Sequence, residues 1–178
     1  MHAIESVTRL EVENSSLVAC LPAQAPRLLV ISPAKDEGRY IARTIATLSA
    51  QTYLPTKWII VNDGSSDDTG AIADEASRTY PWIQVLHRPQ GARRRVGPGV
   101  IEAFCAGLDQ ARLSDYDFIC KLDADLELPP TYFEELMRRF AADSRLGTAS
   151  GKAYVPVGDR FVLERSGDEF SHGVAKLY

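Results

Sequence analysis

Residues 57–69 read KWIIVNDGSSDDT, and this stretch decides the fold. Its apolar part, Lys57–Asn62, is typical of a strand that is buried on both faces. The strand stops at once in a polar turn, where Gly64 permits tight bending and Ser66 or Asp67 can cap a following helix. A buried strand that leads through a tight turn into a helix is the repeating unit of a parallel α/β sheet.

The same alternation continues on both sides of this stretch. Short apolar runs predict further strands at 27–32, 82–86, 117–122 and 148–155. Apolar residues at helical spacing predict helices at 37–51, 66–80, 100–112 and 131–142. Pro33 is expected to stop the first strand. The helix at 100–112 is expected to bury one stripe of apolar residues, Val100, Ile101, Phe104 and Leu108.

Strands and helices in alternation predict an α/β fold of the Rossmann-like kind. We expect three layers, α/β/α, with a mostly parallel central sheet. Residues 1–26 show no sustained period, so we expect them to form an N-terminal extension that is partly ordered at best. The domain proper is expected to span residues 27–178.

Composition and charge argue against several classes of protein. The net charge of the 178 residues is −4, and the basic cluster Arg93–Arg95 is short, so we expect no nucleic-acid partner. No apolar stretch approaches the roughly 18 residues of a spanning helix, and no signal peptide is visible. The cysteines lack metal-ligand spacing and are expected to be free thiols. We therefore expect a cytoplasmic location, and peripheral association with the cytoplasmic face of a membrane stays open.

Carboxylates follow several of the predicted strands directly. Glu37 comes shortly after the first strand, Asp63 after the second, and Asp123 and Asp125 after the fourth. Parallel α/β sheets bind their ligands at the carboxyl ends of the strands. We therefore expect these carboxylates to share one site.

The stretch Asp123-Ala124-Asp125 has the spacing of a metal site. In extended chain, residues two apart point to the same side, so these carboxylates converge. Close carboxylates repel unless a cation or a proton lies between them. Mg²⁺ and Mn²⁺ prefer such oxygen ligands and often share them with a substrate phosphate. The alternative is a pair of loop aspartates that cap the turn into residues 126–130.

Other polar residues near these strand ends have two interpretations each. Asp63 can bind backbone amides of its own turn, or accept hydrogen bonds from a nucleobase or a ribose. Glu37 can simply stabilise a helix N-terminus, and Lys35 is ambiguous in the same way. Arg95 precedes glycines and a helix N-terminus, an arrangement that suits an anion such as phosphate.

Longer motifs can be compared with a known family. Residues 28–37 read LLVISPAKDE, residues 58–69 read WIIVNDGSSDDT, and residues 118–136 read FICKLDADLELPPTYFEEL. In order and spacing they resemble the P-A-x-N-E, V-D-D-G-S-x-D-x-T and D-x-D motifs of the family-2 glycosyltransferases. That family has the GT-A fold and includes dolichyl-phosphate mannosyltransferase-like proteins. The resemblance covers about Arg27 to Val155, with Asp36 where Asn is usual and Asn62 in place of the first Asp.

The resemblance implies a metal-dependent, inverting transfer of a sugar from a UDP- or GDP-linked donor. The acceptor would be a glycan hydroxyl or a lipid phosphate. Pro33 and Glu37 would flank the nucleobase and ribose, and Asp63 would contact the base. The metal, Mg²⁺ or Mn²⁺, would be held against the donor diphosphate by Asp123 and Asp125. Further candidate donor-binding residues are Lys35 and Arg95.

The family's general base, a downstream acidic residue, has no counterpart here, and neither has its Q-x-x-R-W-like segment. Asp168 and Glu169 lie too early in the chain. We therefore expect the base to lie beyond Tyr178, in an acceptor half that this chain lacks, and expect donor and metal binding with slow turnover or none. The alternatives are a non-catalytic nucleotide-sugar-binding domain and a nucleotidyltransferase, although SPAKDEG does not resemble the Gly-rich first loop of the latter.

Overall fold

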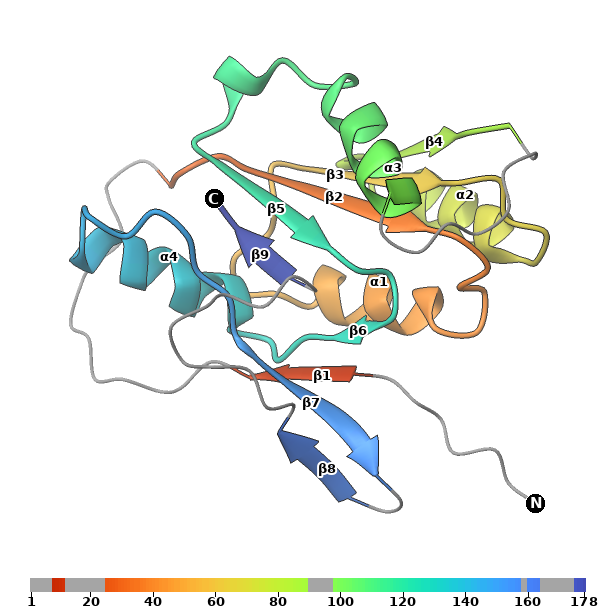
Figure 1. Ribbon diagram of the computed structural model, residues 1–178. Helices are drawn as coiled ribbons and strands as arrows, with labels where there is room; N and C mark the ends of the chain where they lie inside the picture. Colours follow the sequence, from red (N-terminus) through yellow and green to blue (C-terminus); the bar gives the residue numbers. More distant parts are fainter. Residues whose placement is uncertain (1–7, 12–24, 90–97, 158–159, 164–174) are drawn as a thin grey trace.

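The computed structural model describes residues 8–11, 25–89, 98–157, 160–163 and 175–178 (Figure 1). Strands and helices alternate through most of this length. The order is β1 (Thr8–Glu11), β2 (Leu28–Ala34), α1 (Ile41–Ser49), β3 (Lys57–Asn62), α2 (Thr69–Thr79), β4 (Ile83–His87), α3 (Pro98–Leu108), the short 3-10 helix η1 (Leu113–Asp115), β5 (Phe118–Leu122), β6 (Leu126–Glu127), α4 (Tyr132–Ala142), β7 (Lys152–Val157), β8 (Arg160–Leu163) and β9 (Ala175–Leu177).

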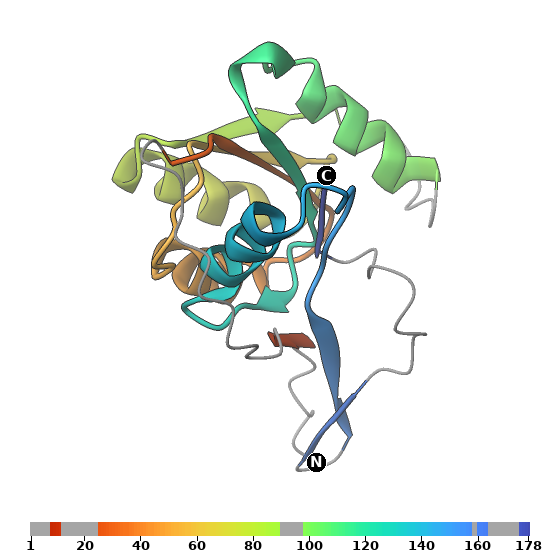
Figure 2. The ribbon, with the colours of Figure 1, turned by 90° about the vertical axis from the view of Figure 1, so that its left-hand side faces the viewer.

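The central sheet has the strand order β4-β3-β2-β5-β9. The first four of these strands run parallel, and β9 joins β5 in the antiparallel direction. Helix α3 covers one face, and α1, α2 and α4 pack against the other, as Figures 1 and 2 show from two sides. This arrangement confirms the predicted Rossmann-like three-layer α/β/α fold with a mostly parallel sheet.

Strand β2 shows why the sheet is buried on both sides. Leu28 and Val30 belong to the core under α1, α2 and α4, whereas Leu29 and Ile31 belong to the core under α3. Such near-continuous apolar sequence is required where helices cover both faces of a parallel sheet. Burying these four side chains completely accounts for the apolar run from which the strand was predicted.

Pro33 does not stop β2, contrary to the sequence prediction. The strand continues to Ala34, whose carbonyl accepts a hydrogen bond of 2.8 Å from Asp63 N in the loop after β3. Successive residues of a strand direct their backbone groups to alternate neighbours, so Pro33 faces the side of β5. Pairing with β5 ends at Ile31, and the missing N–H of Pro33 therefore leaves no ladder bond unmade.

Helix α3 meets the sheet with a different set of side chains from the predicted one. Ala103 and Gly107 are buried, and Phe104 and Leu108 pack partly against the sheet. A Cβ atom on Gly107 would lie 2.6 Å from Ile31 Cγ2, so glycine allows the helix to approach closely. The predicted burial of Val100 and Ile101 is wrong: they are 39% and 63% exposed, because the first turn of α3 extends beyond the strands.

A second, smaller sheet lies beside the main one, with the order β6-β1-β7-β8. Strand β1 pairs in parallel with β6 and antiparallel with β7, so residues 8–11 of the N-terminal segment form part of the fold. The strand predicted at 148–155 is shifted to β7 in this smaller sheet, and Ala149, which precedes β7, forms one bridge to Leu177 at the edge of the central sheet. The edge position of the central sheet is taken by β9 instead.

Leu10 tests whether β1 contributes to stability, because its side chain is completely buried in the core shared with α1 and α4. The substitution Leu10→Ala is expected to lower the free energy of unfolding by about 2–5 kcal/mol, measured by urea denaturation. Leu54→Ala, at a side chain that is 47% exposed, serves as the control and should change it by about 0.5 kcal/mol or less. Equal effects of the two substitutions would contradict the packing of β1.

Candidate functional site

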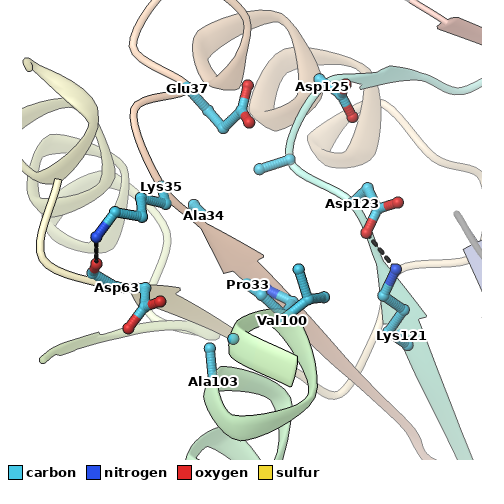
Figure 3. A pocket seen from close by; sticks show the side chains of 12 residues that line it. Pro33, Ala34, Lys35, Glu37, Asp63, Val100, Ala103, Lys121, Asp123 and Asp125 are labelled. Atoms are coloured by element: carbon cyan, nitrogen blue, oxygen red, sulfur yellow. Dashed lines mark hydrogen bonds and ion pairs between the residues drawn. The ribbon is translucent and has the colours of Figure 1, made fainter. Parts of the chain in front are cut away.

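A cavity of about 210 Å³ opens at the carboxyl ends of β2, β3 and β5, next to the first turn of α3 (Figure 3). The predicted site residues that line it are Pro33, Lys35, Glu37, Asp63, Asp123 and Asp125. The other lining residues are Ala34, Gly99, Val100, Ala103, Lys121 and Ala124. Of the predicted candidates, Arg95 lies outside the described residues.

The loops after β2 and β3 are tied together by polar contacts. Asp36 adopts a left-handed backbone conformation with a φ of 56°, and its carboxylate accepts hydrogen bonds from Ser66 N (2.7 Å) and Ser66 Oγ (3.1 Å). Asp and Asn both tolerate this conformation better than most residues, so Asp36 can stand where the family usually has Asn. One residue later, Glu37 N donates to Thr69 Oγ1 at 2.8 Å, which holds the Glu37 backbone at the cavity.

Asp63 forms one wall of the cavity through the tight turn after β3. Gly64 provides the turn with a φ of 65°. Arg88, which follows β4, donates from Nη1 to Asp63 Oδ1 at 2.7 Å, and both side chains are largely buried. Lys35 Nζ donates to the Asp63 carbonyl at 3.0 Å, so it joins the two loops from inside the cavity. These contacts restrict the Asp63 carboxylate to one orientation.

Asn62, the last residue of β3, stabilises this turn and is not among the residues that line the cavity. Its Oδ1 accepts from Ser65 N at 3.0 Å, and its Nδ2 lies 3.0 Å from His87 Nδ1. Because an amide nitrogen only donates, His87 Nδ1 must accept, and His87 Nε2 then donates to Asp74 Oδ1 at 3.0 Å. Asn62 therefore replaces the family's Asp in a structural position.

The Asp123-Ala124-Asp125 segment is held in place by α1. Thr44 is completely buried, and its Oγ1 donates to the Ala124 carbonyl (2.8 Å) and accepts from Leu126 N (3.1 Å). Ala124 is also buried, and Asp123 and Asp125 on either side of it line the cavity, with Asp123 turned towards Lys121. A single hydroxyl thus satisfies the backbone on both sides of Asp125.

The same helix face continues this clamp along the chain. Thr47 Oγ1 accepts from Leu128 N at 3.3 Å. Gln51 donates from Nε2 to the Pro129 carbonyl at 2.7 Å and accepts at Oε1 from Phe133 N at 3.2 Å. Thr44 and Thr47 of α1, together with Gln51 just after the helix, therefore hold the connection from β5 to α4.

The charges around Asp123 oppose one another. Burial raises the pKa of the Asp123 carboxyl, the Lys121 ammonium lowers it, and the neighbouring Asp125 raises it again, so that the net shift is upward. Lys121 Nζ makes an ion pair with Asp123 Oδ1. A further cation next to both carboxylates would favour their ionised forms.

The residues fit a divalent cation that shares its coordination with a substrate. Among the described residues, no group of three or more His, Cys, Asp or Glu side chains could enclose a metal ion. Mg²⁺ and Mn²⁺ commonly use one or two carboxylates and complete their shell with water and substrate phosphates. Asp123 and Asp125, side by side at an open cavity, provide such a partial ligand set.

Several residues at the site were missed by the sequence analysis. Lys121 lies near the end of β5, two residues before Asp123, and in extended chain this spacing indicates a shared face. Arg88 and Thr44 gave no comparable signal, because their partners are 25 and 80 residues away in the chain. Such contacts follow from strand order and helix packing, which a local pattern does not contain.

A comparison with known protein families shows to which family the chain belongs. Residues 29–167 match the model of "Glycosyl transferase family 2". The chain belongs to glycosyl transferase family 2. This confirms the resemblance drawn from the sequence motifs.

Relatives and solved structures agree with this family. The polyprenol monophosphomannose synthase of Mycolicibacterium smegmatis is 34% identical over 157 residues, which cover 82% of this chain and 54% of that protein. The chain therefore spans about half the length of this curated relative. In the parts of the chain that the structure describes, no helix is long and apolar enough to cross a membrane.

Solved structures confirm the GT-A fold. The mannosyltransferase PcManGT from Pyrobaculum calidifontis, solved in complex with GDP-Man and Mn²⁺, superposes with a TM-score of 0.56 at 23% identity, over 78% of this chain and 39% of that one. The glucosyl-3-phosphoglycerate synthase from Mycobacterium tuberculosis, solved with Mn²⁺, UDP and glucosyl-3-phosphoglycerate, gives a TM-score of 0.53 at 22% identity, over 70% and 43%.

Thr44→Val tests the clamp on the aspartate segment, because valine has nearly the same shape but no hydroxyl. The Ala124 carbonyl and Leu126 N would lose their buried partner. The expected loss in the free energy of unfolding is about 2–4 kcal/mol, measured by chemical denaturation. Thr44→Ser keeps the hydroxyl and loses one methyl group, so it should cost only about 1 kcal/mol. A Val variant as stable as the Ser variant would contradict the clamp.

Proposed function

We propose that this chain is the donor-binding part of an inverting, metal-dependent glycosyltransferase. The donor is a nucleoside-diphosphate sugar bound in the cavity at the carboxyl ends of β2, β3 and β5. The observation that carries the proposal is the convergence of Glu37, Asp63, Asp123 and Asp125 on one cavity, although they come from separate strand ends. Chance placement of surface carboxylates would not bring them together at the ligand-binding edge of a parallel sheet.

The nucleoside end of the donor is assigned to the side of the cavity formed by the first two strand ends. Pro33 and Glu37 would flank the nucleobase and ribose, and Asp63 would accept a hydrogen bond from the base. The ion pair with Arg88 and the bond from Lys35 hold the Asp63 turn rigid before the ligand arrives. A preordered acceptor improves affinity because less side-chain freedom is lost on binding.

The diphosphate end is assigned to the opposite side, where Asp123 and Asp125 would hold Mg²⁺ or Mn²⁺. When bound, the cation would supply Lewis-acid stabilisation of the leaving nucleoside diphosphate. The related structures from Pyrobaculum calidifontis and Mycobacterium tuberculosis were solved with Mn²⁺ and a nucleotide, which supports this assignment. Thr44 would keep both aspartates in register while charge develops on the leaving group.

The acceptor is proposed to be a lipid phosphate or a glycan hydroxyl that attacks the anomeric carbon from the face opposite the diphosphate. A phosphate oxygen is already anionic near neutral pH and needs no base, whereas a hydroxyl must lose a proton. The named relative, a polyprenol monophosphomannose synthase, favours the first type of acceptor.

Binding of UDP and GDP, titrated by calorimetry with and without Mn²⁺, tests this proposal. We expect one of the two nucleotides to bind in the presence of Mn²⁺ and the affinity to fall on the order of tenfold or more when Mn²⁺ is chelated, which is about 1.4 kcal/mol. Asp125→Asn should abolish the effect of Mn²⁺ because it removes one anionic ligand without changing side-chain shape.

The matched control is Asp109→Asn, which removes the same charge from an exposed position outside the cavity. It should bind nucleotide as the unmodified chain does. A nucleotide affinity that changes neither with Mn²⁺ nor with Asp125→Asn would reject the metal site. A folded chain that binds neither UDP nor GDP would reject the proposed function as a whole.

A further inference from the structure

Lys121 places a positive charge inside the same cavity as the aspartates. It lies on β5, which ends at Leu122, and Asp123 follows directly beyond the strand, two residues after Lys121. Its Nζ pairs with Asp123 Oδ1, and the two side chains are only 20% and 29% exposed (Figure 3). An oxygen that a metal ion would need is therefore occupied by an ammonium group.

The neighbouring strand favours this position of the ammonium group. Lys176 on β9 stands directly opposite Lys121 in the antiparallel pair of β5 and β9, and residues in such pairs share a face. The two like charges repel each other. The Lys176 ammonium lies 5.2 Å from the centre of the Tyr178 ring, towards the end of β9. Repulsion from Lys176 thus favours the pairing of the Lys121 ammonium group with Asp123.

We propose that Lys121 makes the binding of the divalent cation and of the donor diphosphate depend on each other. The inference rests on the proposed function and concerns how its site is filled. Without ligands, Lys121 neutralises Asp123 and opposes the entry of a cation. When an anionic diphosphate enters, the ammonium group transfers from Asp123 to a phosphate oxygen, and Asp123 becomes free to bind the metal.

Electrostatics fixes the sign of each effect. A positive charge within a few ångströms of the aspartates weakens the binding of any cation there, and the effect is stronger where water is largely excluded. The same charge strengthens the binding of a diphosphate. Because the ammonium group pairs either with Asp123 or with the diphosphate, a diphosphate that draws it away from Asp123 raises the affinity for the metal, and this coupling must be reciprocal.

Two variants separate charge from shape. Lys121→Met keeps an unbranched side chain of similar length but removes the charge, and Lys121→Arg keeps the charge. Lys57→Met is the matched control, because Lys57 opens β3 at the amino end of the sheet, away from the cavity. Urea denaturation of each variant establishes that all of them are folded before binding is compared.

The experiment is a set of calorimetric titrations: Mn²⁺ alone, UDP or GDP with a chelator, and Mn²⁺ in the presence of the nucleotide. Lys121→Met is expected to bind Mn²⁺ alone on the order of tenfold more tightly than the unmodified chain, and the nucleotide alone more weakly. The factor by which nucleotide raises Mn²⁺ affinity should fall by about the same amount. Lys121→Arg and Lys57→Met should behave as the unmodified chain.

The Mn²⁺ titration without nucleotide decides the inference independently of the donor. Equal or weaker Mn²⁺ binding by Lys121→Met overturns it, whatever the nucleotide does. The same increase in Lys57→Met also overturns it, because net charge would then be the cause. Tighter Mn²⁺ binding by Lys121→Met, without binding of UDP or GDP by the unmodified chain, is a separate outcome. It would support the pairing of Lys121 with the metal ligands and reject the proposed donor.

Discussion

The parallel pairing of β2 with both β3 and β5 is the constraint on which the site depends. Parallel strands end at the same edge of a sheet, so this pairing gathers the loops that carry Glu37, Asp63 and the Asp123–Asp125 segment. Apolar side chains on both faces of β2 are buried under helices, and this burial holds the sheet together. The chemistry of the cavity is therefore a consequence of how the core is packed.

Polar contacts between distant segments convert this coarse placement into a defined geometry. Ser66 and Thr69 hold the loop after β2, Arg88 holds Asp63, and Thr44 holds the backbone around Ala124. Each contact links segments that are distant in the chain, so the loops cannot move independently. A site for an anionic donor and a cation gains from such order, since misplaced carboxylates would repel each other with no ligand between them.

The sequence predicted the strands and helices that have a strong apolar pattern. It also predicted those cavity residues that are carboxylates directly after such strands. It did not predict β1, because a strand of four residues is too short to show a period. It assigned the wrong face to the start of α3, where Val100 lines the cavity and Ile101 is exposed. The roles of Thr44, Arg88 and the pair of Lys121 with Asp123 depend on three-dimensional contacts.

The most direct test of the account is a crystal structure of the chain with Mn²⁺ and the nucleotide that it binds. Diffraction data would be collected on both sides of the manganese absorption edge. The account predicts an anomalous peak from a manganese ion between the carboxylates of Asp123 and Asp125. The diphosphate should contact this ion, and the nucleobase should contact Asp63. A manganese peak at other residues, or a nucleotide bound away from the carboxyl ends of β2, β3 and β5, would contradict it.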